Sequence, residues 1–196
     1  NNQITGHTSA FFEPALDYLA LKIPRWDLDK FRKVTHEIST EMKSVGEIMA
    51  LGRSFEEVMQ KGLRMLQIGL YGFVANQDLG IAPENIEKEL KNPTPRRILA
   101  ITEAMKKGWD IQKISKLSGI DEWFLAKLQN IVEVSERVQK AKKIDALLMK
   151  EAKQKGFSDK QLAILSGKKE LVIRTMRKKM GIVPYVKQID TMAAEY

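Results

Sequence analysis

Glu103-Ala104 and Lys107-Gly108-Trp109 match Glu151-Ala152 and Lys155-Gly156-Phe157 at an offset of 48 residues, and the match continues without a gap. Leu117-Ser118-Gly119 returns at the same offset as Leu165-Ser166-Gly167. Each copy reads as a helix, a glycine, an aromatic residue, a short helix, a Ser-Gly turn and a longer helix. Two copies are too few for a solenoid. The repeat therefore predicts two related helical hairpins packed in one domain.

Local capping signals mark several helix starts. Ser54-Phe55-Glu56-Glu57 has the spacing of a capping box, in which the hydroxyl and the carboxylate satisfy orphan backbone donors, and the stretch from Ser158 to Gln161 has it too. Asp110 holds the equivalent N-cap position in the first copy. Thr94-Pro95 predicts a further helix start, with the proline at the first helical position, and that helix should run to about Lys107.

The first fifty residues have a different texture. Ala15 to Ile23 alternates and is rich in large apolar groups, which predicts a strand bounded by Pro14 and Pro24. Leu28 to Val34 predicts a short helix, and Met42 to Gly52 is an apolar stretch without a clear period. A lone strand of this kind would lack its partner strands. The expected fold class is mostly α: a helical domain with two related hairpins, preceded by a short α/β segment.

Composition limits the classes of function. Hydrophobic residues make up 43% of the chain and charged residues 30%, which suits a packed domain with a soluble surface. No run of about 18 apolar residues exists, so no membrane span is expected. Cysteine is absent, which excludes disulfides and thiolate sites and fits a reducing cytoplasm. The chain begins Asn1-Asn2-Gln3 without methionine, so both ends are expected to be cut from a longer protein.

Net charge and the hairpin pattern raise an alternative, a helix-turn-helix module that binds nucleic acid. The net charge is +8, and the segment 139–180 carries 13 lysines and arginines against four carboxylates, a difference of +9. The first copy argues against DNA, because its last helix begins Asp121-Glu122-Trp123-Phe124, where carboxylates would face phosphates. Only the second copy supports the alternative, through its basic residues Lys168, Lys169, Arg174, Arg177, Lys178 and Lys179.

Candidate chemistry is sparse. His7 and His36 have no further ligand at metal spacing, and phosphate loops of the P-loop or dinucleotide type are absent. The stretch from Met42 to Glu47 offers a serine and a glycine, which are more typical of a structural turn than of a phosphate cradle. Large aromatic side chains at helical apolar positions are expected in the core rather than as stacking platforms. These are Trp109, Phe157 and Trp123.

Several stretches, taken in order, resemble the middle of the carbamoyl-phosphate synthase large subunit. They cover essentially the whole chain, and the set is specific although no single motif would suffice. The stretches are Phe12 to Tyr18, Lys22 to Trp26, Met42 to Met49, Gly52 to Glu57, Ile120 to Leu125 and Val186 to Glu195. A departure is Met192, where many members of the family have cysteine.

The resemblance implies a division of the chain. Residues 1–52 resemble the C-terminal end of the carboxyphosphate-forming ATP-grasp unit, and residues 53–196 resemble the helical oligomerisation domain. The family makes carbamoyl phosphate from bicarbonate, glutamine-derived ammonia and two ATP, for arginine and pyrimidine synthesis. Its nucleotide and metal sites (ATP with Mg or Mn) lie outside this segment. The segment alone is therefore expected to hold no catalytic, cofactor or metal residue and to be inactive.

The resemblance also implies partners. The segment should associate with itself, as a dimer, and with the remaining domains of the large subunit, and the full enzyme adds a glutaminase subunit or domain. The expected location is the cytoplasm. Met42 lies in a stretch that resembles the border of the internal route for carbamate, so it is a candidate lining residue, with a plain core role as the alternative.

Overall fold

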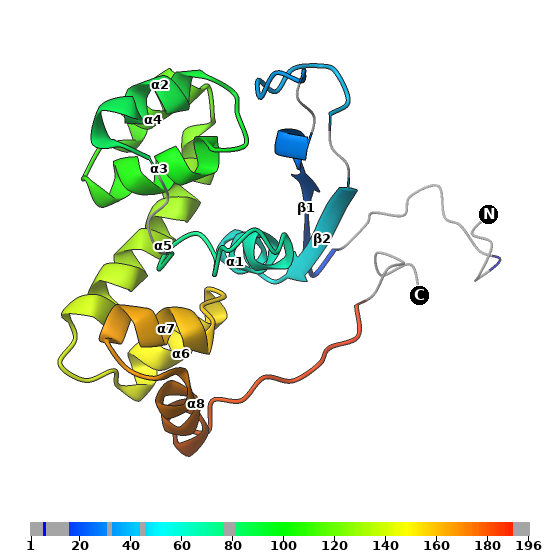
Figure 1. The fold of residues 1–196 in the computed structure, drawn as a ribbon. Helices are drawn as coiled ribbons and strands as arrows, with labels where there is room; N and C mark the ends of the chain where they lie inside the picture. Colours follow the sequence, from blue (N-terminus) through cyan, green and yellow to red (C-terminus); the bar gives the residue numbers. More distant parts are fainter. Residues whose placement is uncertain (1–5, 7–15, 31–32, 44–45, 77–80, 190–196) are drawn as a thin grey trace.

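The computed structural model describes residues 6, 16–30, 33–43, 46–76 and 81–189, and it shows a mostly helical chain preceded by a small sheet (Figure 1). Helix α5 is the long central helix, with α2, α3 and α4 at one end and α6, α7 and α8 at the other, while α1 lies between α5 and the sheet. The strands and helices are β1 (Leu19–Arg25), β2 (Gly46–Gly52), α1 (Phe55–Met65), α2 (Ile86–Lys91), α3 (Arg97–Lys106), α4 (Ile111–Ser118), α5 (Glu122–Lys140), α6 (Ala146–Gln154), α7 (Asp159–Ser166) and α8 (Glu170–Lys179).

The sheet corrects two expectations. The expected strand has a partner, because β1 pairs antiparallel with β2 over its whole length, from Leu19 opposite Gly52 to Arg25 opposite Gly46. Within the apolar stretch from Met42 to Gly52, residues Gly46–Gly52 are therefore a strand. The expected end at Pro24 is also wrong, because β1 continues to Arg25. Both strands are edge strands among the described residues, and proline is tolerated at an edge. The expected boundary at Pro14 lies outside the described residues.

The inner face of the sheet packs on α1. Ile23 and Ile48 lie opposite each other in the pairing and pack against the main core. Gly62 of α1 makes their close approach feasible, because a Cβ atom built at this position would lie 2.7 Å from Ile23 Cδ1. Arg25 adds a polar tie, since its Nη1 donates to the carbonyl of Leu66 at 3.1 Å. The sheet is thus anchored to the helical part through α1.

Helix starts follow the local signals, with two exceptions. Ser54 caps α1, because its side chain accepts from the Glu57 N–H. The Glu57 carboxylate returns to the N–H of Arg53 at 2.8 Å rather than to that of Ser54, so the expected capping box is shifted by one residue. Thr94 accepts from the N–H of Arg96, but this forms a turn, and α3 begins only at Arg97.

The expected helix from Leu28 to Val34 is shorter in the structure. Among the described residues of this stretch, a single 3-10 turn spans Leu28–Lys30. Asp27 precedes it with a positive φ of 36° and accepts from Arg25 and Lys30, which fixes the turn. Side-chain hydrogen bonds from Lys30 and Arg25 lower the pKa of the Asp27 carboxyl. Local ion pairs therefore close a turn where the sequence pattern predicted a helix.

The internal repeat is confirmed, and its second and third helices begin at the same offset. Helices α4 and α5 begin at Ile111 and Glu122, and α7 and α8 begin at Asp159 and Glu170, so both offsets are 48. Asp110 and Ser158 cap α4 and α7 through the same side-chain bond to the third helical N–H, and Ser158 completes its capping box with Gln161. The buried positions correspond as well, in the pairs Ala104 and Ala152, Ile114 and Leu162, and Leu125 and Ile173.

A left-handed glycine ends the first helix of each copy. Gly108 has φ 73° and Gly156 has φ 83°, and in both copies the following aromatic N–H donates to the carbonyl five residues back. The surroundings differ. A Cβ at Gly108 would meet nothing within 4 Å, whereas one at Gly156 would lie 2.9 Å from Glu57 Cα and 3.0 Å from Glu57 O. The second copy thus packs backbone to backbone on α1.

This difference predicts unequal costs for alanine at the two glycines. Gly108→Ala should lower the free energy of unfolding by about 1 kcal/mol, because only the left-handed conformation is penalised. Gly156→Ala should lower it by roughly 3 kcal/mol, since the methyl group also pushes against the rigid backbone of α1. Urea denaturation of the two variants measures this, and equal losses would contradict the close contact between Gly156 and α1.

A buried amide network joins α1 to α7. Gln161 Nε2 donates to Gln60 Oε1 at 2.8 Å and to the carbonyl of Val74 at 3.0 Å. Gln60 Oε1 also accepts from the N–H of Phe73, and Arg64 donates to Gln161 Oε1 at 3.1 Å. Both glutamine side chains are fully buried. The network therefore fixes the 71–76 turn between a helix of the N-terminal part and a helix of the second repeat.

Candidate interaction surface

The second repeat holds a buried carboxylate surrounded by cations. Asp159, at the first position of α7, accepts from Lys153 at 3.0 Å and from Arg177 at 2.9 Å and 3.0 Å, and Arg174 approaches it at 3.3 Å. Asp159 is 6% exposed. Three helices, α6, α7 and α8, thus meet at one charge cluster.

The electrostatics of this cluster favour the charged form of Asp159. Burial would raise the pKa of its carboxyl, but the hydrogen bonds and charges of Lys153 and Arg177 outweigh burial and lower that pKa below the ordinary 3.8. Burial lowers the pKa of Lys153, against the opposing effect of Asp159. An ion pair between them is retained because each buried charge has a hydrogen-bonded partner.

The equivalent positions of the first repeat are largely apolar. Subtracting 48 converts Lys153, Asp159, Arg174 and Arg177 into Met105, Ile111, Ala126 and Gln129. The apolar residues Met105 and Ile111 of the first repeat are therefore replaced by the opposite charges Lys153 and Asp159 in the second. This paired replacement, which is visible when the two copies are aligned, indicates an ion pair between the two positions. Arg174 and Arg177 were predicted only as basic residues that could contact nucleic acid, and Asp159 was not predicted as their partner.

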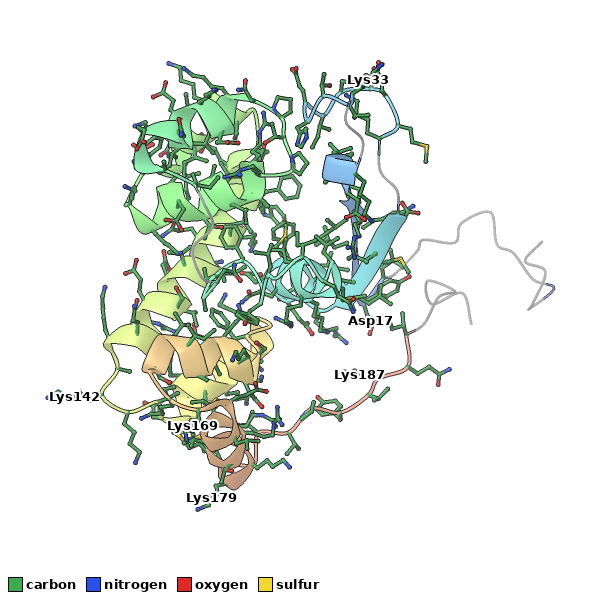
Figure 2. All side chains as sticks on the ribbon, viewed as in Figure 1. Asp17, Lys33, Lys142, Lys169, Lys179 and Lys187 are labelled. Atoms are coloured by element: carbon green, nitrogen blue, oxygen red, sulfur yellow. The ribbon has the colours of Figure 1, made fainter. Side chains whose placement is uncertain are left out.

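The cluster corrects the nucleic-acid alternative. Arg174 and Arg177, two of the basic residues that supported it, are bound to Asp159. Arg174 also pairs with Glu170 at 2.5 Å. Lysines do surround this end of the molecule, as Lys142, Lys169 and Lys179 show in Figure 2. The helix that would read DNA begins at Glu170 and continues with Leu171 and Val172, which are exposed and have no hydrogen-bonding side chain.

Three aromatic rings form an exposed cluster at the start of α5. Trp123 lies 5.8 Å from Phe55 and 5.1 Å from Phe124, and Phe55 lies 5.5 Å from Phe124. Trp123 is 52% exposed and Phe124 44%, so the expectation of a core position for Trp123 is wrong. Phe157 is buried and Trp109 is partly buried against the core, as expected. Ring contacts hold the cluster in place while leaving apolar surface open.

Further large apolar side chains are exposed on other faces. Isolated cases need no explanation, but adjacent ones form surfaces suited to contacts with other protein segments. One of these exposed apolar side chains lies on the outer face of the sheet, and the others lie on α6, α7 and α8. They are Met49, Leu147, Ile164, Leu171 and Val172.

A groove of about 890 Å³ lies between the start of α1, α5, the end of α6 and the segment 185–189. Its carboxylates are paired: Glu57 with Lys61 at 2.5 Å, Glu56 with Lys155 at 3.2 Å and Asp17 with Arg53 at 3.0 Å. Burial would raise the pKa of Glu56, but hydrogen bonds from Asn130 and Lys155 lower it. Paired carboxylates of this kind join the elements that line the groove.

The residues singled out as candidate sites are not brought together. Met42 is 92% exposed, so a core role does not fit, and its role as a lining residue for carbamate stays a prediction. The stretch 42–47 is only partly described. His36 is exposed, and His7 and Met192 lie outside the described residues. Among the residues that the structure describes, no group of three metal-ligating side chains is present.

None of the described helices is long and apolar enough to cross a bilayer. The longest, α5, has 19 residues and carries charged side chains along its length.

Comparison with known proteins agrees with the fold. A family model described as "Carbamoyl-phosphate synthetase large chain, oligomerisation domain" matches residues 47–181. The whole chain is 48% identical to part of the multifunctional protein pyr1-3 of Dictyostelium discoideum, of which it covers 9%. It is 45% identical to part of the carbamoyl phosphate synthase large chain of Sulfolobus acidocaldarius, covering 19%. It is 46% identical to part of the arginine-specific mitochondrial large chain of Neurospora crassa, covering 17%.

The chain therefore spans less than a fifth of the length of these relatives. The identity extends over the entire chain, including the strands that precede the helices. The match gives no support to the nucleic-acid alternative, whose basic helix is instead part of the second repeat. With the fold, the repeat and the sequence match in agreement, this chain belongs to the family of the carbamoyl-phosphate synthetase large chain oligomerisation domain.

Proposed function

We propose that this chain is an assembly segment within the large subunit of a carbamoyl-phosphate synthase. The observation that carries the proposal is the family match over residues 47–181, which includes all eight described α-helices. In this proposal the helical domain associates with a second copy through apolar helix surface. The exposed aromatic cluster of Phe55, Trp123 and Phe124 supports it, because such patches favour protein partners.

The N-terminal part belongs, in the same proposal, to a neighbouring ATP-grasp unit. Residues 1–52 would end that unit and residues 53–196 would form the helical domain. The two-stranded sheet supports a neighbouring unit of this kind, because a sheet of two strands is marginal alone and both of its edges are open among the described residues. Its outer face presents Met49, which is 58% exposed, for further packing.

The intact enzyme would make carbamoyl phosphate from bicarbonate, glutamine-derived ammonia and two ATP, with Mg or Mn, for arginine or pyrimidine synthesis. Its ATP sites would lie in domains outside this chain, and a glutaminase subunit or domain would supply ammonia. The names of the relatives support both pathways, since one is arginine-specific and another is the multifunctional protein pyr1-3. The expected cytoplasmic location stays a prediction, because the Neurospora relative is named mitochondrial.

The proposal predicts that the isolated chain neither binds nor hydrolyses ATP. The carboxylates of the groove described above are held in ion pairs, and the sequence has no phosphate loop. Isothermal titration of the chain with ATP and magnesium should give no binding heat, and bicarbonate should not stimulate phosphate release. A stoichiometric, magnesium-dependent ATP site would overturn the assignment as an assembly segment.

A further inference from the structure

Helix α8 exposes two apolar residues between lysines. Leu171 is 69% exposed and Val172 is 45% exposed. Lys168 and Lys169 precede the helix, and Lys178 and Lys179 end it, all with exposed side chains; Figure 2 shows Lys169 and Lys179 on this end of the molecule. Leu171 and Lys178 lie on one face of α8, because residues four and seven positions apart share a helix face. We define this apolar and basic surface as the α8 face.

The first repeat shows how the same positions are covered elsewhere in the molecule. The repeat offset converts Leu171 and Val172 into Trp123 and Phe124 of α5. In α5 this pair receives a side chain from outside the repeat, because Phe55 of α1 packs on both rings at 5.8 Å and 5.5 Å. The start of a separate helix therefore fits over this position of the repeat.

A polar contact accompanies the aromatic one. Glu56, directly after Phe55, accepts from Asn130 Nδ2 at 2.8 Å, and the same oxygen pairs with Lys155 of α6 at 3.2 Å. The repeat offset converts Asn130 into Lys178 of the α8 face. In the first repeat, the acidic residue that follows the aromatic one meets the amide of Asn130. An acidic residue placed in the same way on the second repeat would meet the positive charge of Lys178. Charge-assisted hydrogen bonds of this kind are stronger than neutral ones.

We propose that the α8 face binds an acidic helical segment of another protein, which presents an aromatic side chain to Leu171 and Val172 and the next carboxylate to Lys178. The contacts that Phe55 and Glu56 of α1 make with α5 are the template for this pose. The lysines at both ends of α8 select acidic partners and speed their approach. This inference goes beyond the proposed assembly function and does not depend on it.

Two other occupants fit the α8 face less well. A second copy of the same face would bring like charges together, since four lysines surround the two apolar residues. A nucleic acid would meet Leu171 and Val172 where hydrogen-bonding side chains are needed to read bases. An acidic segment offers both the apolar contact and the opposite charge, so the chemistry of the surface favours it.

Fluorescence anisotropy tests the proposal with a labelled probe peptide that begins Ser-Phe-Glu-Glu and continues in alanine, leucine and glutamate. The intact chain should bind the probe, and salt should weaken the binding. Leu171→Ala should weaken it at least tenfold, and Lys178→Glu should do the same. Ile68→Ala, which trims an exposed side chain in the segment after α1, should leave the affinity unchanged within a factor of two.

A charge exchange sharpens the test. A probe with lysine in place of the first glutamate should bind the Lys178→Glu variant better than it binds the unaltered chain. Absence of probe binding to the unaltered chain at millimolar concentration would refute the proposal. A loss of probe affinity in the Ile68→Ala variant equal to that in the Leu171→Ala variant would also refute it. Tighter binding of an unrelated DNA duplex would refute it by assigning the face to nucleic acid. Loss of self-association in the Leu171→Ala variant would refute it by assigning the face to a second copy.

Discussion

Asp159→Asn is expected to lower the free energy of unfolding by about 3–5 kcal/mol, because it leaves three cations close together without their anion. Lys153, Arg174 and Arg177 all contact this carboxylate in the structure. Denaturation in urea at pH 7 measures the loss. Glu133→Gln removes an exposed carboxylate from α5 and should change stability by less than about 0.5 kcal/mol.

The pH dependence gives a second measure of the same carboxylate. Its pKa is lower in the folded chain than the ordinary 3.8, so the folded state binds fewer protons than the unfolded state in this range. The stabilisation is therefore present above about pH 4 and is lost as the pH falls through the folded pKa. The Asp159→Asn variant should lack this part of the acid transition, and an unchanged acid transition would contradict the account.

The first repeat supplies a rescue for the Asp159 variant. Replacing Lys153, Asp159, Arg174 and Arg177 by the first-repeat residues Met, Ile, Ala and Gln removes the cations together with the anion. Buried ion pairs are often replaced by apolar residues without loss. The fourfold variant should therefore be more stable than Asp159→Asn alone. If it is less stable, the second repeat depends on its charges for more than their mutual neutralisation.

Gln161→Ala is expected to cost roughly 3 kcal/mol or more. It leaves the carbonyl of Val74 without its side-chain donor and the N–H of Ser158 without its acceptor. It also removes one of the two donors to Gln60 Oε1 and one of the three acceptors of Arg64. Each buried polar group without a partner costs about 1–3 kcal/mol. Urea denaturation measures the change, and hydrogen exchange in the 71–76 turn should rise with it, since the turn loses its tie to α7.

The matched control for Gln161 is its counterpart in the first repeat. The offset converts Gln161 into Lys113, which is exposed and lies 3.5 Å from the centre of the Trp109 ring. Lys113→Ala should cost only about 0.5–1 kcal/mol, the range for an exposed cation over an aromatic ring. Similar losses for the two variants would show that the buried amide network does not hold α1 to α7.

The sequence predicted the helical repeat well because its signals are local. Asp110 and Ser158 cap α4 and α7 with side-chain bonds that span three residues, so neighbouring residues alone determine these starts. Strand β2 was missed because Met49, Ala50 and Leu51 are apolar on both faces of the sheet, which hides the alternation. The start of α3 was placed too early because Thr94 uses its side chain in a turn instead.

Long-range features could not be predicted from local pattern. The Asp159 cluster depends on how α6 and α8 pack around α7, and the contact between Glu56 and Asn130 joins residues 74 positions apart. Trp123 was expected in the core because of its apolar character, yet it lies at a surface where Phe55 covers only part of the ring. Apolar character alone does not separate a core position from an interaction surface.

Sedimentation equilibrium of the isolated chain over a salt series tests the central proposal, self-association through apolar helix surface, most directly. The expected state is a symmetric dimer, because a two-fold contact uses one patch twice and closes on itself. Apolar association should hold or tighten as sulfate rises, whereas charge pairing should weaken once the Debye length falls below about 8 Å. A monomer at every salt concentration and at high protein concentration would contradict the account.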